Sequence, residues 1–301
     1  MGRSGWSVGR RWAGVLAAGL AVLGLSGFMA AWPGAGRDPT LRVMTYNVRG
    51  VADPPPRDWR TRLPLVKRLL RKHDPDLLGV QEAKWPQMRD LERALPGHRW
   101  VGMGLRGDTR DQFLAIFYRA ERFDVLDSGH FWLSGTPDVI GSATWGNRYV
   151  RMVTWVKLRD RRTGVVFYQL NTHFDHESEN SRVKSAELVL KKVREFEAGV
   201  PVLAAGDFNA AAGNSRPYSM LTGTDAFQDT WVTARRRGAQ YKTDARWQAP
   251  VPGGRRVDWI LSRGAVETLW SEIDPWQVGG VYPSDHFPVI AHLRLDVRAA
   301  S

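Results

Sequence analysis

The chain has 301 residues, of which 43% are hydrophobic and 11% aromatic, a composition that excludes a disordered chain, a collagen-like fibre and a coiled coil. It contains no cysteine, which excludes a disulfide framework, an iron–sulfur cluster and a cysteine nucleophile. The formal net charge of +12 favours polyanionic partners such as nucleic acid, phospholipid headgroups or phosphorylated metabolites, although an arginine-rich composition that keeps the protein soluble explains it equally well.

The first 36 residues have the pattern of a targeting segment. Arg3, Arg10 and Arg11 precede an uncharged stretch at residues 12–32 that is rich in Ala, Leu, Gly and Val. A signal peptide and a membrane anchor both stay open, because the stretch is long for the first, just long enough for the second, and followed by no clear cleavage site. Either one places the rest of the chain outside the cytoplasm, since positive residues stay inside. We therefore predict a signal peptide or membrane anchor plus linker at residues 1–36, and one extracytoplasmic domain at residues 37–301 that keeps +9 of the charge.

Along the rest of the chain, apolar strands alternate with helical segments. Strands are expected at residues 41–48, 76–81, 113–118, 149–158, 165–171, 201–205, 257–261 and 287–295. Helices are expected at residues 59–72 and 179–196, where apolar residues recur at helical spacing. Residues 213–252 are polar and arginine-rich, and we expect them to form long loops over one end. Because some strands are separated by helices and others follow each other directly, we expect an α/β fold of two mixed sheets packed face to face with helices outside.

Six of the apolar segments end in polar residues that can bind a metal or a phosphate. Carboxylates just beyond buried strands are costly unless they are paired or metal-bound. An oxygen-rich set without cysteine suits Mg²⁺ or Mn²⁺ better than a structural Zn²⁺. Each residue also has an ordinary explanation taken alone, such as a turn cap for Asn47 or an Asx turn for Asp207 and Asn209. The set consists of Asn47, Glu82, His173, Asp207, Asn209, Asp258, Asp285 and His286.

The same segments resemble the endonuclease/exonuclease/phosphatase superfamily, which includes deoxyribonuclease I, deadenylases and neutral sphingomyelinases. The matching pieces occur in family order and span nearly all of the chain after the linker. They are TYNVRG at 45–50, GVQEAK at 79–84, NTHFDH at 171–176, GDFNA at 206–210, RVDWIL at 256–261 and SDHFPV at 284–289. The resemblance implies a four-layer α/β/β/α sandwich with its catalytic site at one end of the two sheets. The form NTHFDH followed by Arg182 is most similar to the deadenylase-like and bacterial secreted branch.

The resemblance also implies a metal site and a set of phosphate contacts. Glu82 is expected to be the principal ligand of Mg²⁺ or Mn²⁺, with Asn47 beside it, and Asp285 to touch a metal directly or through water. Arg151 and Arg182 are weaker candidates for phosphate contacts. For Arg151, a position on a surface strand is an equally good explanation.

The remaining matched residues are expected to carry the acid–base chemistry. By resemblance, Asp207 orients and deprotonates the attacking water, and Asn209 holds Asp207 or the phosphate in place. His286 binds the phosphate as a cation or protonates the leaving oxygen, with Asp258 orienting it and raising its pKa. His173 donates a hydrogen bond to the charge that develops on the phosphorus centre.

Three functions are compatible with these patterns. The first is an extracytoplasmic, metal-dependent phosphodiesterase acting on nucleic acid, which the positive charge and the deadenylase-like motifs favour. The second is a phosphoesterase acting on phospholipid headgroups or small phosphorylated metabolites. The third is a non-catalytic binding module, which the presence of Asp207 and His286 disfavours. No obligate protein partner is predicted, and residues 12–32 would anchor the protein to a membrane if they are retained.

Overall fold

The computed structural model describes residues 39–295. The predicted signal peptide or anchor at residues 1–36 lies outside the described residues. None of the helices within residues 39–295 is both long and apolar enough to span a membrane.

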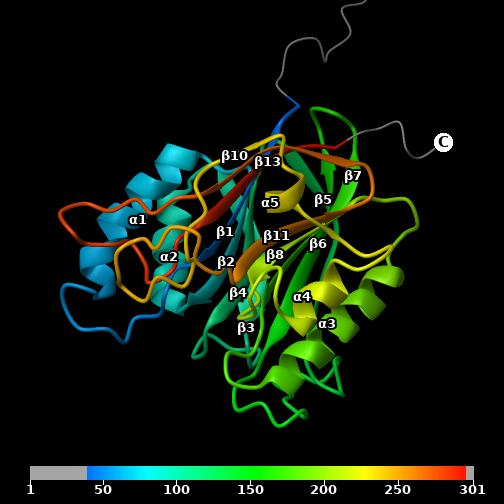
Figure 1. Cartoon of the computed structure of the whole chain (residues 1–301), viewed down its shortest axis with the longest axis horizontal. Helices are drawn as coiled ribbons and strands as arrows, with labels where there is room; N and C mark the ends of the chain where they lie inside the picture. Colours follow the sequence, from blue (N-terminus) through cyan, green and yellow to red (C-terminus); the bar gives the residue numbers. More distant parts are fainter. Residues whose placement is uncertain (1–38, 296–301) are drawn as a thin grey trace, which may run out of the picture. The chain divides into compact units, whose positions relative to one another are not determined.

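Two mixed β-sheets form the centre of the domain (Figure 1). The first has the order β10-β12-β13-β1-β2-β4-β3, and the second has the order β5-β6-β7-β8-β11-β9. The strands of the first sheet are β1 (Leu41–Asn47), β2 (Leu77–Ala83), β3 (His98–Gly104), β4 (Phe113–Arg119), β10 (Arg236–Arg237), β12 (Val266–Ile273) and β13 (Val289–Leu295). The strands of the second are β5 (Phe123–Trp132), β6 (Met152–Asp160), β7 (Val166–His173), β8 (Val202–Asp207), β9 (Gln228–Asp229) and β11 (Asp258–Arg263).

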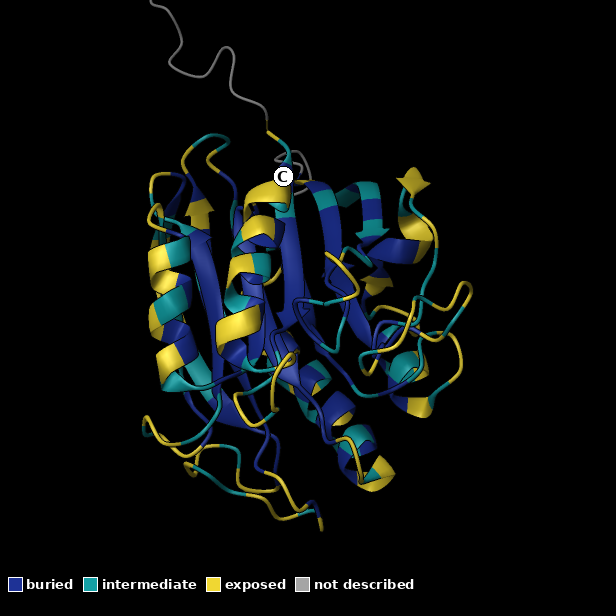
Figure 2. Cartoon of the chain, turned by 90° about the vertical axis from the view of Figure 1, so that its left-hand side faces the viewer, coloured by how far each residue is buried: buried dark blue, intermediate teal, exposed yellow. Residues whose placement is uncertain are grey.

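Helices cover the outer face of each sheet. The apolar sides of α1 (Trp59–His73) and α2 (Trp85–Ala94) pack on the first sheet, where Val66 and Met88 share one core cluster with Val80. On the second sheet, α3 (Glu179–Arg194) buries Ala186 and Val189, and α4 (Arg216–Leu221) lies against α3, while α5 (Thr230–Thr233) lies near β11 and β12. Figure 2, which looks onto α1 and α2, shows exposed residues along the outer sides of these two helices and buried strands behind them.

The largest core cluster lies between the sheets. It joins residues of the first sheet, such as Val43 and Ile116, to residues of the second, such as Phe167 and Leu203. With the helical layers outside, this arrangement is the predicted four-layer α/β/β/α sandwich, and the fold class expected from the sequence is confirmed. A buried amide pair also joins the sheets, because Gln81 Nε2 donates to Asn171 Oδ1 at 2.7 Å.

All of the expected strands and both expected helices are present, with ends that shift by up to three residues. The largest shift is in the strand expected at 149–158, which begins only at Met152. Eight elements were not expected: α2, β3, β5, α4, β9, α5, β10 and β12. Four of these, α4, β9, α5 and β10, are short elements within residues 213–252, so the expectation that this region consists of loops was wrong in part.

Two of the eight, β3 and β5, contain a glycine, a residue that is unfavourable within a strand. In both strands the glycine is required because a neighbouring group packs closely against it. A Cβ on Gly102 would lie 2.5 Å from the carbonyl oxygen of Leu114, and one on Gly129 would lie 2.8 Å from the Trp155 ring.

Candidate active site

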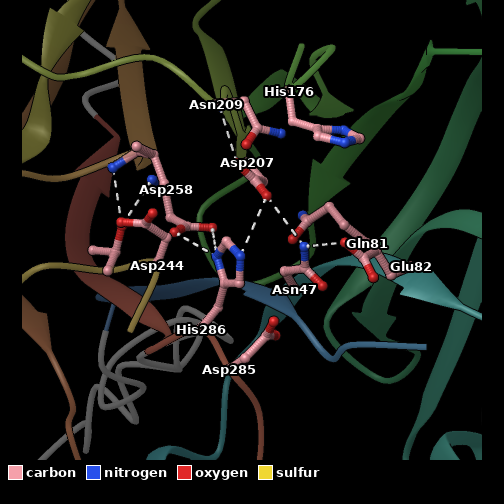
Figure 3. Close-up of polar contacts among 12 residues, drawn as sticks. Asn47, Gln81, Glu82, His176, Asp207, Asn209, Asp244, Asp258, Asp285 and His286 are labelled. Carbon is pink, nitrogen blue, oxygen red and sulfur yellow. Dashed lines mark hydrogen bonds and ion pairs between the residues drawn. The ribbon is translucent and has the colours of Figure 1, made fainter. Parts of the chain in front are cut away.

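Six strands bring the predicted site residues to one end of the two sheets. Parallel strands β1 and β2 end there, as do parallel strands β7 and β8, while β13 and β11 run antiparallel to β1 and β8 and begin there. In register, Asp207 lies opposite both His173 and Asp258. A pocket of about 190 Å³ lies at this end (Figure 3). The residues that line it are Arg49, Glu82, His173, His176, Asp207, Asn209, Asp244, Arg246, Asp285 and His286.

Glu82 reaches the pocket through an irregularity at the end of β2. The pairing of β2 with β4 shifts register between Val80 and Ala83, and Glu82 has a φ of 66°. This left-handed conformation is strained for a residue other than glycine, and such strain and bulges concentrate at active sites. Asn47 Nδ2 donates to Glu82 Oε1 at 2.9 Å and to Asp207 Oδ2 at 3.1 Å, so one amide links the two carboxylates.

Two carboxylates of the pocket, those of Asp207 and Asp285, have raised pKa values. Burial, together with repulsion from Asp258, raises the pKa of Asp207 to about 7. Burial also raises the pKa of Asp285, and the nearby charge of Glu82 adds to the effect. Carboxylates gather here in a buried place where their negative charge is unfavourable, and a divalent cation would compensate it. The oxygen-rich donors Asn47, Glu82 and Asp285 therefore fit Mg²⁺ or Mn²⁺.

His286 and Asp258 form a buried ion pair beside Asp207. His286 Nδ1 lies 3.0 Å from Asp258 Oδ2, and His286 Nε2 lies 3.8 Å from Asp207 Oδ2. Burial alone would lower the pKa of His286, but the charges of Asp258 and Asp207 raise it well above its ordinary value. The ligand-type atoms of these three residues lie within 4.8 Å of one another. We interpret this group as a charged hydrogen-bonded cluster instead of a metal site, because the imidazolium already pairs with both carboxylates.

Arg151 lies behind two histidines of the pocket. Arg151 Nη1 donates to His173 Nδ1 at 2.9 Å, and Arg151 Nη2 donates to His176 Nδ1 at 3.0 Å. An arginine only donates hydrogen bonds, so both Nδ1 atoms accept and each neutral ring carries its proton on Nε2. Burial and the charge of Arg151 lower the pKa of His173, which keeps that ring neutral. The His173 Nε2 atom lies 3.4 Å from Asp207 Oδ2.

Neither of the predicted phosphate contacts, Arg151 and Arg182, lines the pocket. Arg151 has only 3% of its surface exposed and contacts the histidines. The structure does not bring Arg182 to the pocket, because its guanidinium donates to the Asp175 carbonyl at 2.8 Å and to Glu179 Oε2 at 2.7 Å.

The other predicted residues lie at the pocket wall. Asn209 has a φ of 49°, donates its backbone N–H to Asp207 Oδ1 at 3.0 Å and anchors its side chain on the Phe174 carbonyl. Asp285 Oδ2 lies 3.7 Å from Arg49 Nη1. The structure therefore brings together all eight residues of the predicted metal and catalytic sets.

Four pocket residues were not predicted: Arg49, His176, Asp244 and Arg246. Arg49 and His176 belong to the matched segments TYNVRG and NTHFDH, so the motifs contained them without revealing their contacts. Asp244 and Arg246 come from the irregular region at 213–252, where no sequence pattern marks them. The backbone N–H of Arg246 donates to the Asp285 carbonyl at 2.8 Å, which ties this region to the site.

A buried arginine on α1 holds two of the site loops. Arg62 donates all five of its N–H groups to backbone carbonyls: Arg57, Val48, Pro283, Arg49 and Gly50, at 2.7 to 3.1 Å. Its guanidinium also lies over the rings of Trp59 and Trp247. Arg62 thereby joins the segment after Asn47 to the segment before Asp285.

Comparison with known proteins gives consistent matches. The sequence model of the Endonuclease/Exonuclease/phosphatase family matches residues 44–286. The structure is similar to a mannosyl-6-phosphatase of Bacteroides thetaiotaomicron, with 30% identity, a TM-score of 0.80, and coverage of 84% of this chain and 99% of that one. It is also similar to an endonuclease/exonuclease/phosphatase protein of Bacteroides vulgatus, with 33% identity, a TM-score of 0.79, and coverage of 85% and 99%.

Among curated sequences, an uncharacterized protein of Acanthamoeba polyphaga mimivirus is 24% identical over an alignment of 232 residues that covers 60% of this chain. The match spans about a third of that protein, 32% of its length.

Proposed function

Because the chain belongs to the endonuclease/exonuclease/phosphatase family, we propose that it is an extracytoplasmic hydrolase that uses Mg²⁺ or Mn²⁺ to cleave phosphate esters. The observation that carries this proposal is the convergence of Glu82, Asp207 and the His286–Asp258 ion pair on one pocket. The extracytoplasmic location rests on the arginines and the uncharged stretch of residues 1–36.

Asn47, Glu82 and Asp285 would hold the metal. When bound, the ion would neutralise a phosphate oxygen and the leaving group.

The chain's own residues supply the rest of the chemistry. Asp207 suits a general base for water because its pKa of about 7 lies near neutral pH. Asn209 holds that carboxylate through its backbone N–H. His286, kept cationic by Asp258, is suited to bind the phosphate, and the Nε2–H of His173 is suited to donate to its developing charge.

For the substrate we favour a small phosphorylated sugar. The similar structure from B. thetaiotaomicron is a mannosyl-6-phosphatase, and a pocket of about 190 Å³ is the size of a small phosphorylated group. This choice reverses the order expected from the sequence.

Nucleic acid remains the second candidate. It is supported by the +9 charge of residues 37–301, which favours a substrate with many phosphates.

A substrate panel tests the proposal. The purified chain with Mg²⁺ would be incubated with mannose 6-phosphate, glucose 6-phosphate, single- and double-stranded oligonucleotides, and vesicles containing phosphatidylinositol phosphates. We expect phosphate release from the sugar phosphates, abolished by chelation and strongly reduced by His286→Ala. Absence of hydrolysis of every substrate, or hydrolysis that survives exhaustive chelation, would contradict the proposed function.

A further inference from the structure

A second and larger cavity adjoins the active-site pocket. It has a volume of about 390 Å³ and shares Arg49, Glu82 and His176 with the pocket. We name it the Asp111 groove after the carboxylate in its wall. The groove residues that the argument uses are Lys84, Arg106, Asp111, Gln112 and Tyr149. Because the two cavities share one wall, a substrate whose phosphate sits in the pocket can extend into the groove.

The groove presents hydrogen-bond donors and acceptors side by side. Asp111 Oδ2 lies 3.1 Å from Arg106 Nη1, and Asp111 Oδ1 lies 3.7 Å from Lys84 Nζ. All three side chains are partly exposed, so each has further capacity: the carboxylate accepts, while the ammonium and guanidinium donate. Gln112 is a further lining residue, and its amide can do both.

This pattern suits hydroxyl groups better than a second anion. A hydroxyl both donates and accepts, so two neighbouring hydroxyls can bind a carboxylate and a guanidinium that lie next to each other. The cavity is also lined by four cationic side chains, but each has a partner already: Arg49 pairs with Asp53, Lys84 and Arg106 pair with Asp111, and Arg151 donates to two histidines. A second phosphate would have to compete with these carboxylates for the cations, whereas a hydroxyl can bind without breaking the pairs.

An aromatic ring completes the wall. Tyr149 has 37% of its surface exposed. The centroid of its ring lies 4.8 Å from that of the His176 imidazole, and the two ring planes are tilted by 35°. The guanidinium groups of Arg148 and Arg151 lie 5.5 and 5.7 Å from the centroid of the same ring, so the apolar surface that Tyr149 offers to a cyclic ligand is the part that remains exposed.

We propose that the Asp111 groove binds the sugar part of a phosphorylated sugar, with Asp111 and Arg106 hydrogen-bonding to neighbouring hydroxyls and Tyr149 lying against the ring. The inference rests on the proposed phosphoesterase function, because the pocket must hold the phosphate while the groove holds the sugar. Asp111 is then a specificity-determining residue, which contacts the sugar and not the reacting phosphate.

The first test compares mannose 6-phosphate with cyclohexylmethyl phosphate, which has a six-membered ring but no hydroxyls. Sites built to bind hydroxyls reject analogues that lack them, so we expect kcat/KM to favour mannose 6-phosphate by about a hundredfold or more. Asp111→Ala should reduce this ratio by about tenfold or more, and Arg106→Ala should do the same. Asp127→Ala, an exposed carboxylate on β5, is the matched control and should leave the ratio unchanged.

The second test does not depend on turnover. Saturation-transfer NMR would detect the weak binding of mannose to the wild-type chain, to Asp111→Ala and to Asp127→Ala, after circular dichroism has verified that each is folded. We expect the signal to be lost only in Asp111→Ala. If mannose binds in this way while no phosphate ester is cleaved, the groove stands and the proposed function fails. If esters are cleaved but both substrates are equivalent and Asp111→Ala binds mannose like wild type, the function stands and the groove is overturned.

Discussion

Arg151 lies between His173 and His176 and donates one terminal N–H to the Nδ1 atom of each ring. The two imidazoles are therefore held in the same tautomer by one buried guanidinium. Since Arg151 has only 3% of its surface exposed, its contribution to the site acts through the histidines. The sequence suggested a direct phosphate contact; the geometry makes Arg151 a positioning residue for the ring that faces Asp207.

We expect Arg151→Met to remove the hydrogen bonds that hold the two histidines in this tautomer. The Nδ1 atom of His173 would lose its donor, the ring would populate both tautomers, and kcat would fall on the order of tenfold to a hundredfold. Nitrogen-15 chemical shifts of the histidine side chains would report the tautomers directly. Arg182→Met is the matched control, because Arg182 contacts Glu179 and the Asp175 carbonyl instead of the pocket. Unchanged nitrogen shifts in Arg151→Met would overturn the assignment.

The next prediction concerns the contribution of Arg62 to the free energy of unfolding. Arg62→Met would leave five backbone carbonyls without their donor, and a buried acceptor without a partner costs about 1–3 kcal/mol. Water would hydrogen-bond to some of these carbonyls and offset part of the cost. We therefore expect the free energy of unfolding to fall by about 3 kcal/mol or more. Urea denaturation would measure the loss. Arg60→Met, an exposed arginine on the same helix, should change stability by less than about 0.5 kcal/mol.

The contrast between these arginines shows what the sequence could and could not reveal. The metal and catalytic residues were predictable because each follows or precedes a buried apolar strand, which is a local pattern. Arg62 and Arg151 have no such pattern: their roles come from contacts with residues 5 to 221 positions away in the sequence. Asp244 and Arg246 lie in an aperiodic region that reaches the site only through tertiary hydrogen bonds, such as that between Arg246 and Asp285.

Metal binding should be measurable without turnover. A cation that binds the folded chain alone stabilises it in proportion to the logarithm of its concentration, so Mg²⁺ or Mn²⁺ should raise the Tm progressively. Glu82→Gln removes the charge of the principal expected ligand and should abolish most of this increase. Glu187→Gln, an exposed residue on α3, should retain it. A Tm that does not respond to either ion in the wild-type chain would count against the metal site.

The salt response separates the two substrate candidates. If an oligonucleotide is a substrate, its contacts with several cationic side chains would release counterions, and KM should rise steeply between about 50 and 200 mM salt. For mannose 6-phosphate, which has one phosphate, the dependence should be shallow. Kinetics with both substrates over this range would make the comparison. A flat response with an oligonucleotide would remove the support that the +9 charge gives to nucleic acid.

The last prediction concerns the ion pair of His286 and Asp258, in which His286 Nδ1 lies 3.0 Å from Asp258 Oδ2. Because the carboxylates raise the pKa of His286, the imidazole stays charged through neutral pH, and activity that needs the cation is lost only as the pH rises through that raised pKa. Asp258→Asn removes the main favourable charge, so the loss of activity should move to lower pH. A pH–rate profile of kcat/KM would show the shift.

The same pair should behave as a unit. Asp258→Asn and His286→Ala should each lower kcat/KM on the order of a hundredfold, as for a lost acid–base or transition-state contact. The double variant should be little worse than the worse single variant, because both changes damage one charged group. Far-UV circular dichroism would verify folding. Strictly additive losses would leave His286 as an independent phosphate contact, whereas near-wild-type turnover of His286→Ala at saturating Mg²⁺ would remove His286 from the catalytic set altogether.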